Sequence, residues 1–230
     1  MRKKDTRLVI EPAKQEILKM ELCGTTDLIL HKRHRSFELA QMWKLSHPLG
    51  AVPPKHLSDT THRVWEHLIT TITWRDPIVF HDDDFDLYTE DEWKYYMENN
   101  APCILNIAFI KSMGQAFKTF GYKTKLKKDG TDLARAVSPI RTMSPITFAT
   151  VSPKSKLVPT GGINSADVMM SYNQFSGWKC NLELLLAGDV FPPETVIEVL
   201  ATTGKFIGVG TQRKEGYGRW EIKNAELIRS

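Results

Sequence analysis

The sequence predicts an α+β fold, because segments with strand character and segments with helix character alternate along the chain. Strand signals dominate Ile17–Leu30, Gly177–Leu186 and Gly218–Lys223. Between them, Cys103–Phe120 and Phe191–Gly204 have the composition and spacing of helices. An apolar content of 41% is enough for a globular protein with a buried core.

The N-terminal part predicts a loose basic arm and a first core strand. Residues 1–15 are mostly polar and basic, and the strand pattern of Ile17–Leu30 is interrupted by a bulge or turn at Gly24–Asp27. A run of basic or potentially basic residues follows at His31–Arg35. Its candidate phosphate contacts are Lys32, Arg33 and Arg35. A solvated polar connection explains the same run equally well.

Residues 36–100 predict an insertion lobe rather than part of a compact core. Four of the six tryptophans and four prolines fall in this stretch, and its apolar spacing is irregular. Short helices are expected at Thr60–Thr73 and Asp91–Met97. An exposed tryptophan here would stack on an unpaired base, but for any single one the core of the lobe is the simpler interpretation.

Cys103–Phe120 is the clearest central helix, with an apolar stripe that includes Ile107, Met113 and Phe117 and an end at Gly121. A lysine-rich run follows it directly. Its members are Lys123, Lys125, Lys127 and Lys128. On an extended segment these side chains would follow a phosphate backbone, and the alternative is an ordinary solvated face.

Residues 138–176 are rich in Ser, Pro, Thr, Gly and Lys and predict a projecting β-hairpin. Ile146–Val151 is its clearest strand-like piece. The strand Gly177–Leu186 and a turn at Ala187–Asp189 then lead into the last helix.

The last forty residues are the most informative. In Phe191–Gly204, Pro193 suits the first helical turn, Glu194 suits its positive dipole end, and Gly204 predicts the helix stop. A glycine-rich basic loop follows at residues 208–219. Its members are Gly208, Gly210, Arg213, Lys214, Gly216, Tyr217, Gly218 and Arg219. Glycine has no Cβ and accepts positive φ, so we expect backbone N–H groups here to hold phosphates beside the cations while Tyr217 stacks on a base.

This unit resembles the C-terminal glycine-rich loop of the RAMP superfamily, the repeat-associated RNA-binding proteins of CRISPR effector complexes. The shared pattern is Gly-x-Gly, polar residues with an Arg, then Gly-apolar-Gly-Arg-aromatic, which ends here at Trp220. Ile17–Leu30 and Ala101–Phe117 are more weakly similar to the opening strand and helix of such domains. The pattern is also similar to small phage proteins, and an ordinary glycine-containing hairpin is the competing interpretation.

The resemblance implies a ferredoxin-like (RRM-like) core with an antiparallel sheet, an α-rich insertion and a β-hairpin projection that folds over a bound strand. It divides the chain into an arm with the first strand (1–35), the insertion lobe (36–100) and the remainder of the core (101–230). It also implies nucleic-acid contact and assembly of several copies along a strand, but not catalysis.

Charge is unevenly distributed along the chain. Residues 82–92 hold seven of the 27 acids and neither Lys nor Arg, which leaves 20 acids against 31 bases elsewhere. A basic body favours phosphate binding, because charges act locally, within about 8–10 Å. The same asymmetry fits self-association, in which the acidic lobe of one copy meets the basic face of another.

The remaining sequence features limit the compartment, the cofactors and the metals that we expect. Cys23, Cys103 and Cys180 are odd in number and widely spaced, which predicts buried reduced thiols in the cytoplasm, or in the host cytoplasm for a phage protein. No apolar run is long enough to span a membrane. No nucleotide-phosphate loop, serine elbow or metal-ligand spacing is present, so we expect no cofactor and no metal.

We therefore expect a non-catalytic protein that binds single-stranded nucleic acid, RNA in preference to DNA, in several copies. A structural protein that self-associates through basic and acidic faces is the first alternative. The second is a metal-independent endoribonuclease that uses His31 or His34 as a general acid or base, since histidine titrates near neutral pH.

Overall fold

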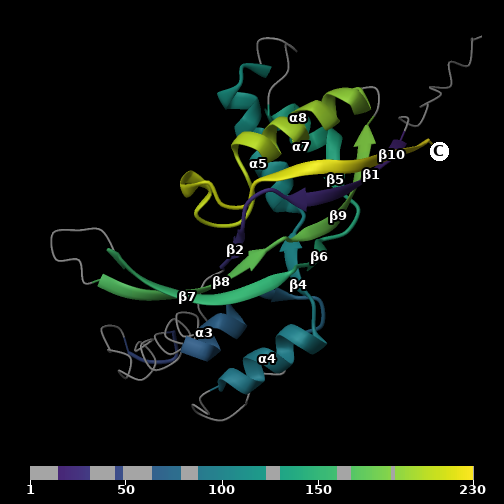
Figure 1. Ribbon diagram of the computed structural model, residues 1–230. Coiled ribbons are helices and arrows are strands. Elements are labelled where there is room, and N and C mark those ends of the chain that lie inside the picture. The colour runs from purple at the N-terminus through teal and green to yellow at the C-terminus, as the bar shows by residue number, and fades with distance from the viewer. Residues whose placement is uncertain are drawn as a thin grey trace, which may run out of the picture.

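The computed structural model describes residues 15–31, 45–48, 64–78, 88–122, 130–159, 167–187 and 190–229 (Figure 1). Its central antiparallel sheet has the strand order β10-β1-β9-β6-β4-β3, and β5 also pairs with β9. These strands are β1 (Gln15–Gly24), β3 (Thr73–Trp74), β4 (Pro102–Leu105), β5 (Val137–Pro139), β6 (Met143–Thr147), β9 (Lys179–Ala187) and β10 (Trp220–Arg229).

The connections between these strands are those of a ferredoxin-like core. Helix α5 (Ile107–Thr119) connects the first core strand to β5 and β6, and α8 (Pro193–Phe206) connects β9 to β10. Strand β1 lies between β10 and β9, and β9 in turn pairs with β5 and β6. The core order is therefore β10-β1-β9-β5/β6, with antiparallel neighbours. Helix α7 (Gly130–Ala136) lies on the same side of the sheet as α5 and α8 (Figure 1). The α+β, ferredoxin-like expectation is confirmed.

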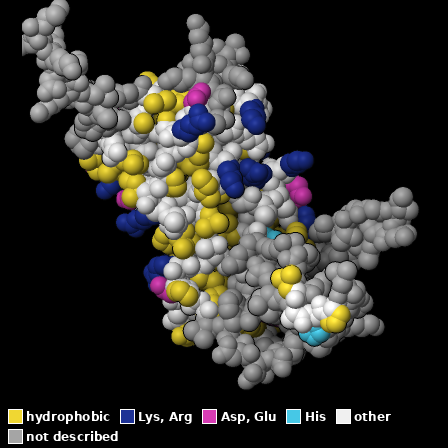
Figure 2. Space-filling model, turned by 180° about the vertical axis from the view of Figure 1, so that it is seen from behind, with side chains coloured by type: hydrophobic (Ala, Val, Ile, Leu, Met, Phe, Trp, Pro, Cys, Tyr) yellow, Lys and Arg dark blue, Asp and Glu magenta, His cyan; other side chains and the backbone are white. Residues whose placement is uncertain are grey.

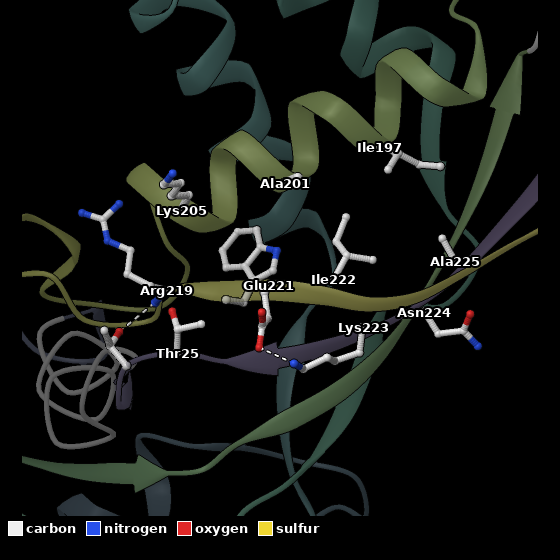
Figure 3. Close-up of a pocket in the computed structure, with 12 residues that line it drawn as sticks. Thr25, Ile197, Ala201, Lys205, Arg219, Glu221, Ile222, Lys223, Asn224 and Ala225 are labelled. Atoms are coloured by element: carbon white, nitrogen blue, oxygen red, sulfur yellow. Dashed lines mark hydrogen bonds and ion pairs between the residues drawn. The ribbon is translucent and has the colours of Figure 1, made fainter.

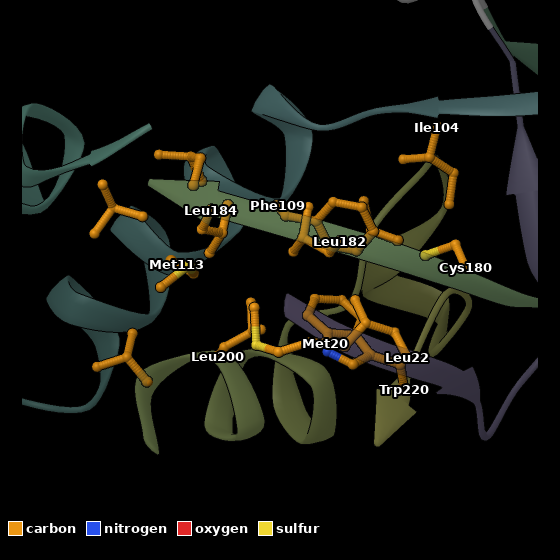
Figure 4. Close-up of a cluster of buried hydrophobic side chains, with 14 of the residues drawn as sticks. Met20, Leu22, Ile104, Phe109, Met113, Cys180, Leu182, Leu184, Leu200 and Trp220 are labelled. Carbon is orange, nitrogen blue, oxygen red and sulfur yellow. The ribbon is translucent and has the colours of Figure 1, made fainter. Parts of the chain in front are cut away.

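Alternation of side chains in the strands explains why the helices cover only one face of the sheet. In β1, Leu18, Met20 and Leu22 are buried, while Lys19 between them is exposed. In β9, the even-numbered residues from Cys180 to Leu186 are all buried. These side chains pack against apolar residues of the two helices, including Phe109, Met113 and Leu200 (Figure 4). The opposite side of the sheet, which we call the open face, carries charged and polar side chains such as Lys19 and Glu183 beside an apolar group formed by Ile17, Leu185 and Ile228.

A second sheet extends from the core, with the order β2-β8-β7. Its strands are β2 (Leu28–Leu30), β7 (Thr150–Pro159) and β8 (Asp167–Ser176), the last two forming a long hairpin. Helices α3 (Val64–Thr70) and α4 (Glu90–Asn99) lie along this sheet (Figure 1). The fully buried Asn173 holds the two parts together: its amide donates to the carbonyl of Leu68 at 2.7 Å and accepts from the Trp93 indole at 2.8 Å.

Two helix boundaries differ from the sequence prediction. Cys103 and Ile104 belong to β4, which pairs with β3 and β6, and the helix starts only at Ile107. Gly204 does not end α8, which continues to Phe206. A Cβ at Gly204 would meet the indole nitrogen of Trp220 at 2.7 Å. This glycine therefore lets the helix pack closely on β10 and is not a stop.

The three cysteines are buried free thiols, as the sequence predicts. Burial raises the pKa of Cys103 to about 11 and that of Cys180 to about 12, so both stay protonated near neutral pH. None of the described helices is both long and apolar enough to span a membrane.

Candidate nucleic-acid interface

The glycine-rich loop is fastened to the turn between β1 and β2 by backbone hydrogen bonds. The amide of Gly218 donates to the carbonyl of Asp27 at 2.7 Å, and that of Thr211 donates to Ile29 at 3.0 Å. In the other direction, the amide of Thr25 donates to the carbonyl of Arg219 at 2.9 Å. These contacts join residues about 190 positions apart in the sequence. They give the loop a fixed position at the edge of the core.

The geometry of the glycines explains why the loop needs them. Gly210 and Gly218 have φ of 81° and 70°, a region that other residues rarely occupy. A Cβ at Gly210 would lie 2.5 Å from the carbonyl oxygen of Ile29, and one at Gly218 would collide with the carbonyl of Val209. The glycines therefore let backbone pack directly on backbone.

One part of the sequence interpretation is wrong, because three glycine N–H groups are used inside the protein. Gly208 donates to Thr203 at 2.9 Å, Gly216 to Arg213 at 3.0 Å, and Gly218 to Asp27. Their amides cannot also hold a phosphate while these bonds persist. The local sequence could not show this, since the glycines serve the packing of distant segments.

The cationic side chains of the loop differ in how they are held. Arg213 donates from Nη1 to Ser112 Oγ on α5 at 3.0 Å, and Lys214 next to it is exposed in the short 3₁₀ turn Arg213–Glu215. Arg219 and Tyr217 are half-buried. Burial lowers the pKa of Arg219, and its Nη1 has no hydrogen-bond partner in the described part of the chain. This nitrogen is also shielded from solvent, so Arg219 carries a buried cationic donor without an acceptor in the described part of the chain.

A groove of about 790 Å³ opens beside Arg219, between α8 and β10 (Figure 3). Its lining includes aliphatic residues, with Ile197 and Ala201 on the helix and Ile222 on the strand. Polar residues complete it, namely Thr25, Thr26, Asn224 and the ion pair of Lys223 with Glu221. Lys205 and Arg219 lie at the same end of it (Figure 3). The sequence interpretation missed Lys205, although its place in the last helical turn before the loop was an available signal.

Two further lysines reach this region from the hairpin. Lys156 Nζ lies 3.4 Å from Glu215 Oε1, so β7 and the loop are in contact. Lys154 is exposed two residues earlier, on the same side of the strand. We use the name loop surface for the resulting group of cations, which comprises Lys154, Lys156, Lys205, Arg213, Lys214 and Arg219. The alternating Lys-Ser-Lys pattern marked the two hairpin residues, but only the strand pairing places them here.

The remaining predicted phosphate contacts lie outside the described residues. They are Lys32, Arg33 and Arg35 after β2, and Lys123, Lys125, Lys127 and Lys128 after α5. The flanking residues are described: Tyr122 hydroxyl lies 2.9 Å from Thr202 Oγ1 on α8. Tyr122, the last described residue before the lysine-rich run, therefore contacts the helix that carries Lys205. The phosphate contacts of this run stay a prediction.

The tryptophans of the insertion lobe are mostly structural. Trp74 and Trp93 are buried, and Trp93 also packs against Trp65, with ring centroids 5.7 Å apart. Trp74 and Trp93 therefore belong to the core, which was the simpler interpretation of any single tryptophan, and neither ring is free to stack on a base. Trp43 lies outside the described residues.

The candidate general acid His31 is engaged by a second histidine. Its Nε2 lies 3.0 Å from Nε2 of His67, which is buried in α3, and burial lowers the pKa of His31. His34 and the acidic run that begins at His81 lie outside the described residues. Within the described ranges, no three His, Cys, Asp or Glu side chains gather in a way that could hold a metal ion.

The chain is similar in overall fold to solved structures, while its sequence matches no known family. No protein-family model matches the chain, and no relative is found among curated proteins. One chain of the cryo-EM structure of the Type III-B Cmr-beta bound to cognate target RNA is similar, with a TM-score of 0.47 and 14% identity. The match covers 94% of this chain and 61% of that chain, so this chain spans less than two thirds of its length.

Proposed function

We propose that this protein binds single-stranded nucleic acid through the loop surface and does not cleave it. The observation that carries the proposal is the position of Arg219: its guanidinium, with an unpartnered Nη1 in the described part of the chain, lies with Lys205 at one end of the groove. A phosphate there would contact the accessible part of this guanidinium and the Lys205 ammonium, because guanidinium and phosphate form short charge-assisted hydrogen bonds.

The fixed loop makes this surface suitable for a polyanion. Backbone bonds to Asp27 and Ile29 hold the loop in place, so its cations need little further ordering when a ligand arrives. Glu215 contacts the loop surface through Lys156, and Glu221 lines the groove but is paired with Lys223. Figure 2 shows Lys and Arg side chains lying among hydrophobic ones on one face of the molecule. Positive charge is not confined to the loop, since Lys19, Arg141 and Lys179 lie on the open face.

An unpaired strand suits the groove better than a duplex. Its aliphatic residues, Ile197, Ala201 and Ile222, offer a contact for bases or sugars, which a duplex keeps stacked inside. Preference for RNA over DNA rests on the similarity of the Gly218-Arg219-Trp220 motif to the loop of RNA-binding RAMP proteins.

The test is a titration of a labelled single-stranded RNA of about 16 nucleotides at several salt concentrations. Log affinity should fall with log salt with a slope of about 0.7 for each phosphate neutralised. R219Q should reduce that slope by about one phosphate. The matched control is K179Q on the open face, which should leave the slope unchanged. Absence of binding at low salt, or equal effects of the two variants, contradicts the proposal.

Lack of cleavage is part of the proposal and is measured separately. The contact with His67 occupies Nε2, one of the two ring nitrogens with which His31 could transfer a proton. Hairpin RNA incubated with the protein and a chelator should stay intact. Fragments that disappear in H31A or H34A would instead favour the endoribonuclease alternative.

Self-association is a second candidate function, favoured by the outer edge of β10. This ten-residue strand pairs with β1 on one side and with no other described strand on the other. If several copies assemble along a strand, mass photometry should show masses that rise stepwise with oligonucleotide length. A structural protein would instead grow with protein concentration alone, without nucleic acid.

A further inference from the structure

The helix layer carries two exposed aromatic rings that touch each other. Phe120 directly follows α5 and is 41% exposed, and Phe206 ends α8 and is 49% exposed. Their ring centroids are 5.2 Å apart with planes inclined by 43°. Single exposed apolar side chains are common on proteins, but two adjoining phenyl rings form a patch that burial in this chain does not explain.

The other aromatic rings of the two helices show the contrast. Phe109 packs edge-on against Trp220, and Phe117 packs edge-on against Phe191, all four being fully or almost fully buried. The sequence therefore places its core aromatics inside the helix layer. Phe120 and Phe206 lie beyond that core, at the ends of the helices where each chain segment leaves the layer.

One cation, Lys205, contacts this aromatic pair, and a second, Lys118, lies near it in sequence. Lys205 Nζ lies 5.3 Å from the centroid of the Phe206 ring, within the range of a cation–π contact. Lys118 is exposed two residues before Phe120. The glycine-rich loop begins two residues after Phe206, and Lys205 also lines the Arg219 end of the groove (Figure 3). The rings are thus continuous with the loop surface through Lys205.

We propose that Phe120 and Phe206 form a stacking platform for an unpaired base of the strand that the loop surface binds. The inference rests on the proposed function. A phosphate at Lys205 places the adjoining nucleotide next to the phenyl rings, whose faces accept any base without regard to sequence. A protein partner fits this patch less well, because Lys205 contacts the ring of Phe206 and lysines are depleted from the centres of protein interfaces.

The platform contributes to affinity in a way that differs from the cations. Stacking releases no counterions, so it changes affinity without changing the salt dependence. A cation contact changes both. This difference separates the platform from the loop surface experimentally, even though Lys205 belongs to both.

The experiment compares F120L/F206L with the unaltered chain, since leucine keeps apolar volume but removes the ring face. Binding of single-stranded RNA should weaken by about 10-fold, at an unchanged salt slope. An oligonucleotide of abasic sites should bind both proteins equally. F206Y keeps an aromatic face and should retain affinity. Y95L is the control, because Tyr95 is 62% exposed on α4, away from the loop surface. Thermal melting confirms that each variant is folded.

Each outcome decides the matter. If the unaltered chain binds RNA and F120L/F206L binds it equally well, the platform is wrong while the proposed function stands. If the unaltered chain binds no nucleic acid, both fail. If F120L/F206L keeps full affinity but loses self-association, the patch is a protein interface, which also overturns the inference.

Discussion

The open face of the central sheet and the loop surface are both rich in charge, but they arrange it in opposite ways. On the open face, Lys19 lies 3.9 Å and Arg141 lies 3.5 Å from the carboxylate of Glu183. Glu226 lies opposite Lys19 on the next strand. Cations and acids are therefore interleaved there, and the described strands place no aromatic ring on that face.

The loop surface, by contrast, concentrates cations. Glu215 contacts Lys156, but the Nη1 of Arg219 has no partner in the described residues. In RRM-type domains the sheet face itself binds RNA through aromatic rings. This chain shares the fold but lacks those rings on its open face. The comparison teaches that strand order alone does not locate a binding surface, and that charge and side-chain chemistry must do so.

The largest effect is expected from a variant that disturbs the packing of the glycine-rich loop against the core. G218V adds a branched side chain at φ 70°, against the carbonyl of Val209. We expect the free energy of unfolding to fall by about 3 kcal/mol, from backbone strain and overlap together, with loss of nucleic-acid binding.

G216A is the matched control for this prediction. Gly216 also has a positive φ, 92°, but nothing lies within 4 Å of an added Cβ. Its cost should be only about 1 kcal/mol, from conformation alone. Urea unfolding of both variants measures the difference. Equal destabilisation would mean that the loop is not packed against the core as described.

The second prediction reverses charges on the two faces. K205E/R219E should weaken RNA binding by about 100-fold at low salt, because two attractive contacts become repulsive ones in the same groove. K19E/K179E makes the same change in net charge on the open face and should cost less than about 3-fold, since only long-range attraction is lost. Fluorescence anisotropy measures both. Similar losses would show that binding depends on net charge and not on the loop surface.

Local patterns were enough to predict the fold class. The strand signals of Ile17–Leu30 and Gly177–Leu186 and the helix signals of Cys103–Phe120 and Phe191–Gly204 are properties of neighbouring residues, and their order along the chain predicted an α+β fold. The glycines of the loop were likewise recognisable. Their purpose was not, because the groups that they approach, Asp27 and Ile29, are about 190 positions away in sequence.

The same limit applies to the candidate site. Lys154 and Lys156 reach the loop only because β7 pairs with β8 and β8 pairs with β2, a register that no local window contains. Gly204 was misread as a helix stop for the same reason, since its close neighbour Trp220 belongs to another element. The roles of Lys154, Lys156 and Gly204 therefore depend on contacts between segments far apart in the sequence and not on local propensities.

The third prediction uses pH to separate stability from binding. Burial lowers the pKa of His31 in the folded chain, so the unfolded chain takes up the proton more readily. Stability should therefore fall as the pH drops below about 6.5, by at most about 1.4 kcal/mol per pH unit for this one group. H31Q should flatten that part of the curve. Lys and Arg side chains ordinarily keep their charge across this range, so RNA affinity should change little between pH 7.5 and 6. A parallel fall in affinity and stability would mean that the histidine pair, and not only the loop surface, takes part in binding.

The smallest expected effect is a gain in RNA affinity, whereas the charge-reversal variants above are expected to lose affinity. E215Q removes the acid that lies 3.4 Å from Lys156 and releases that ammonium for a phosphate. Affinity for RNA should rise by about 2- to 3-fold, since an exposed ion pair of this kind contributes only about 0.2–1 kcal/mol. E183Q on the open face, where Glu183 contacts Lys19 and Arg141, is the matched control and should leave affinity within error. Because both variants raise the net charge by one, any difference between them comes from position. A gain with E183Q as large as the gain with E215Q would remove the distinction between the two faces.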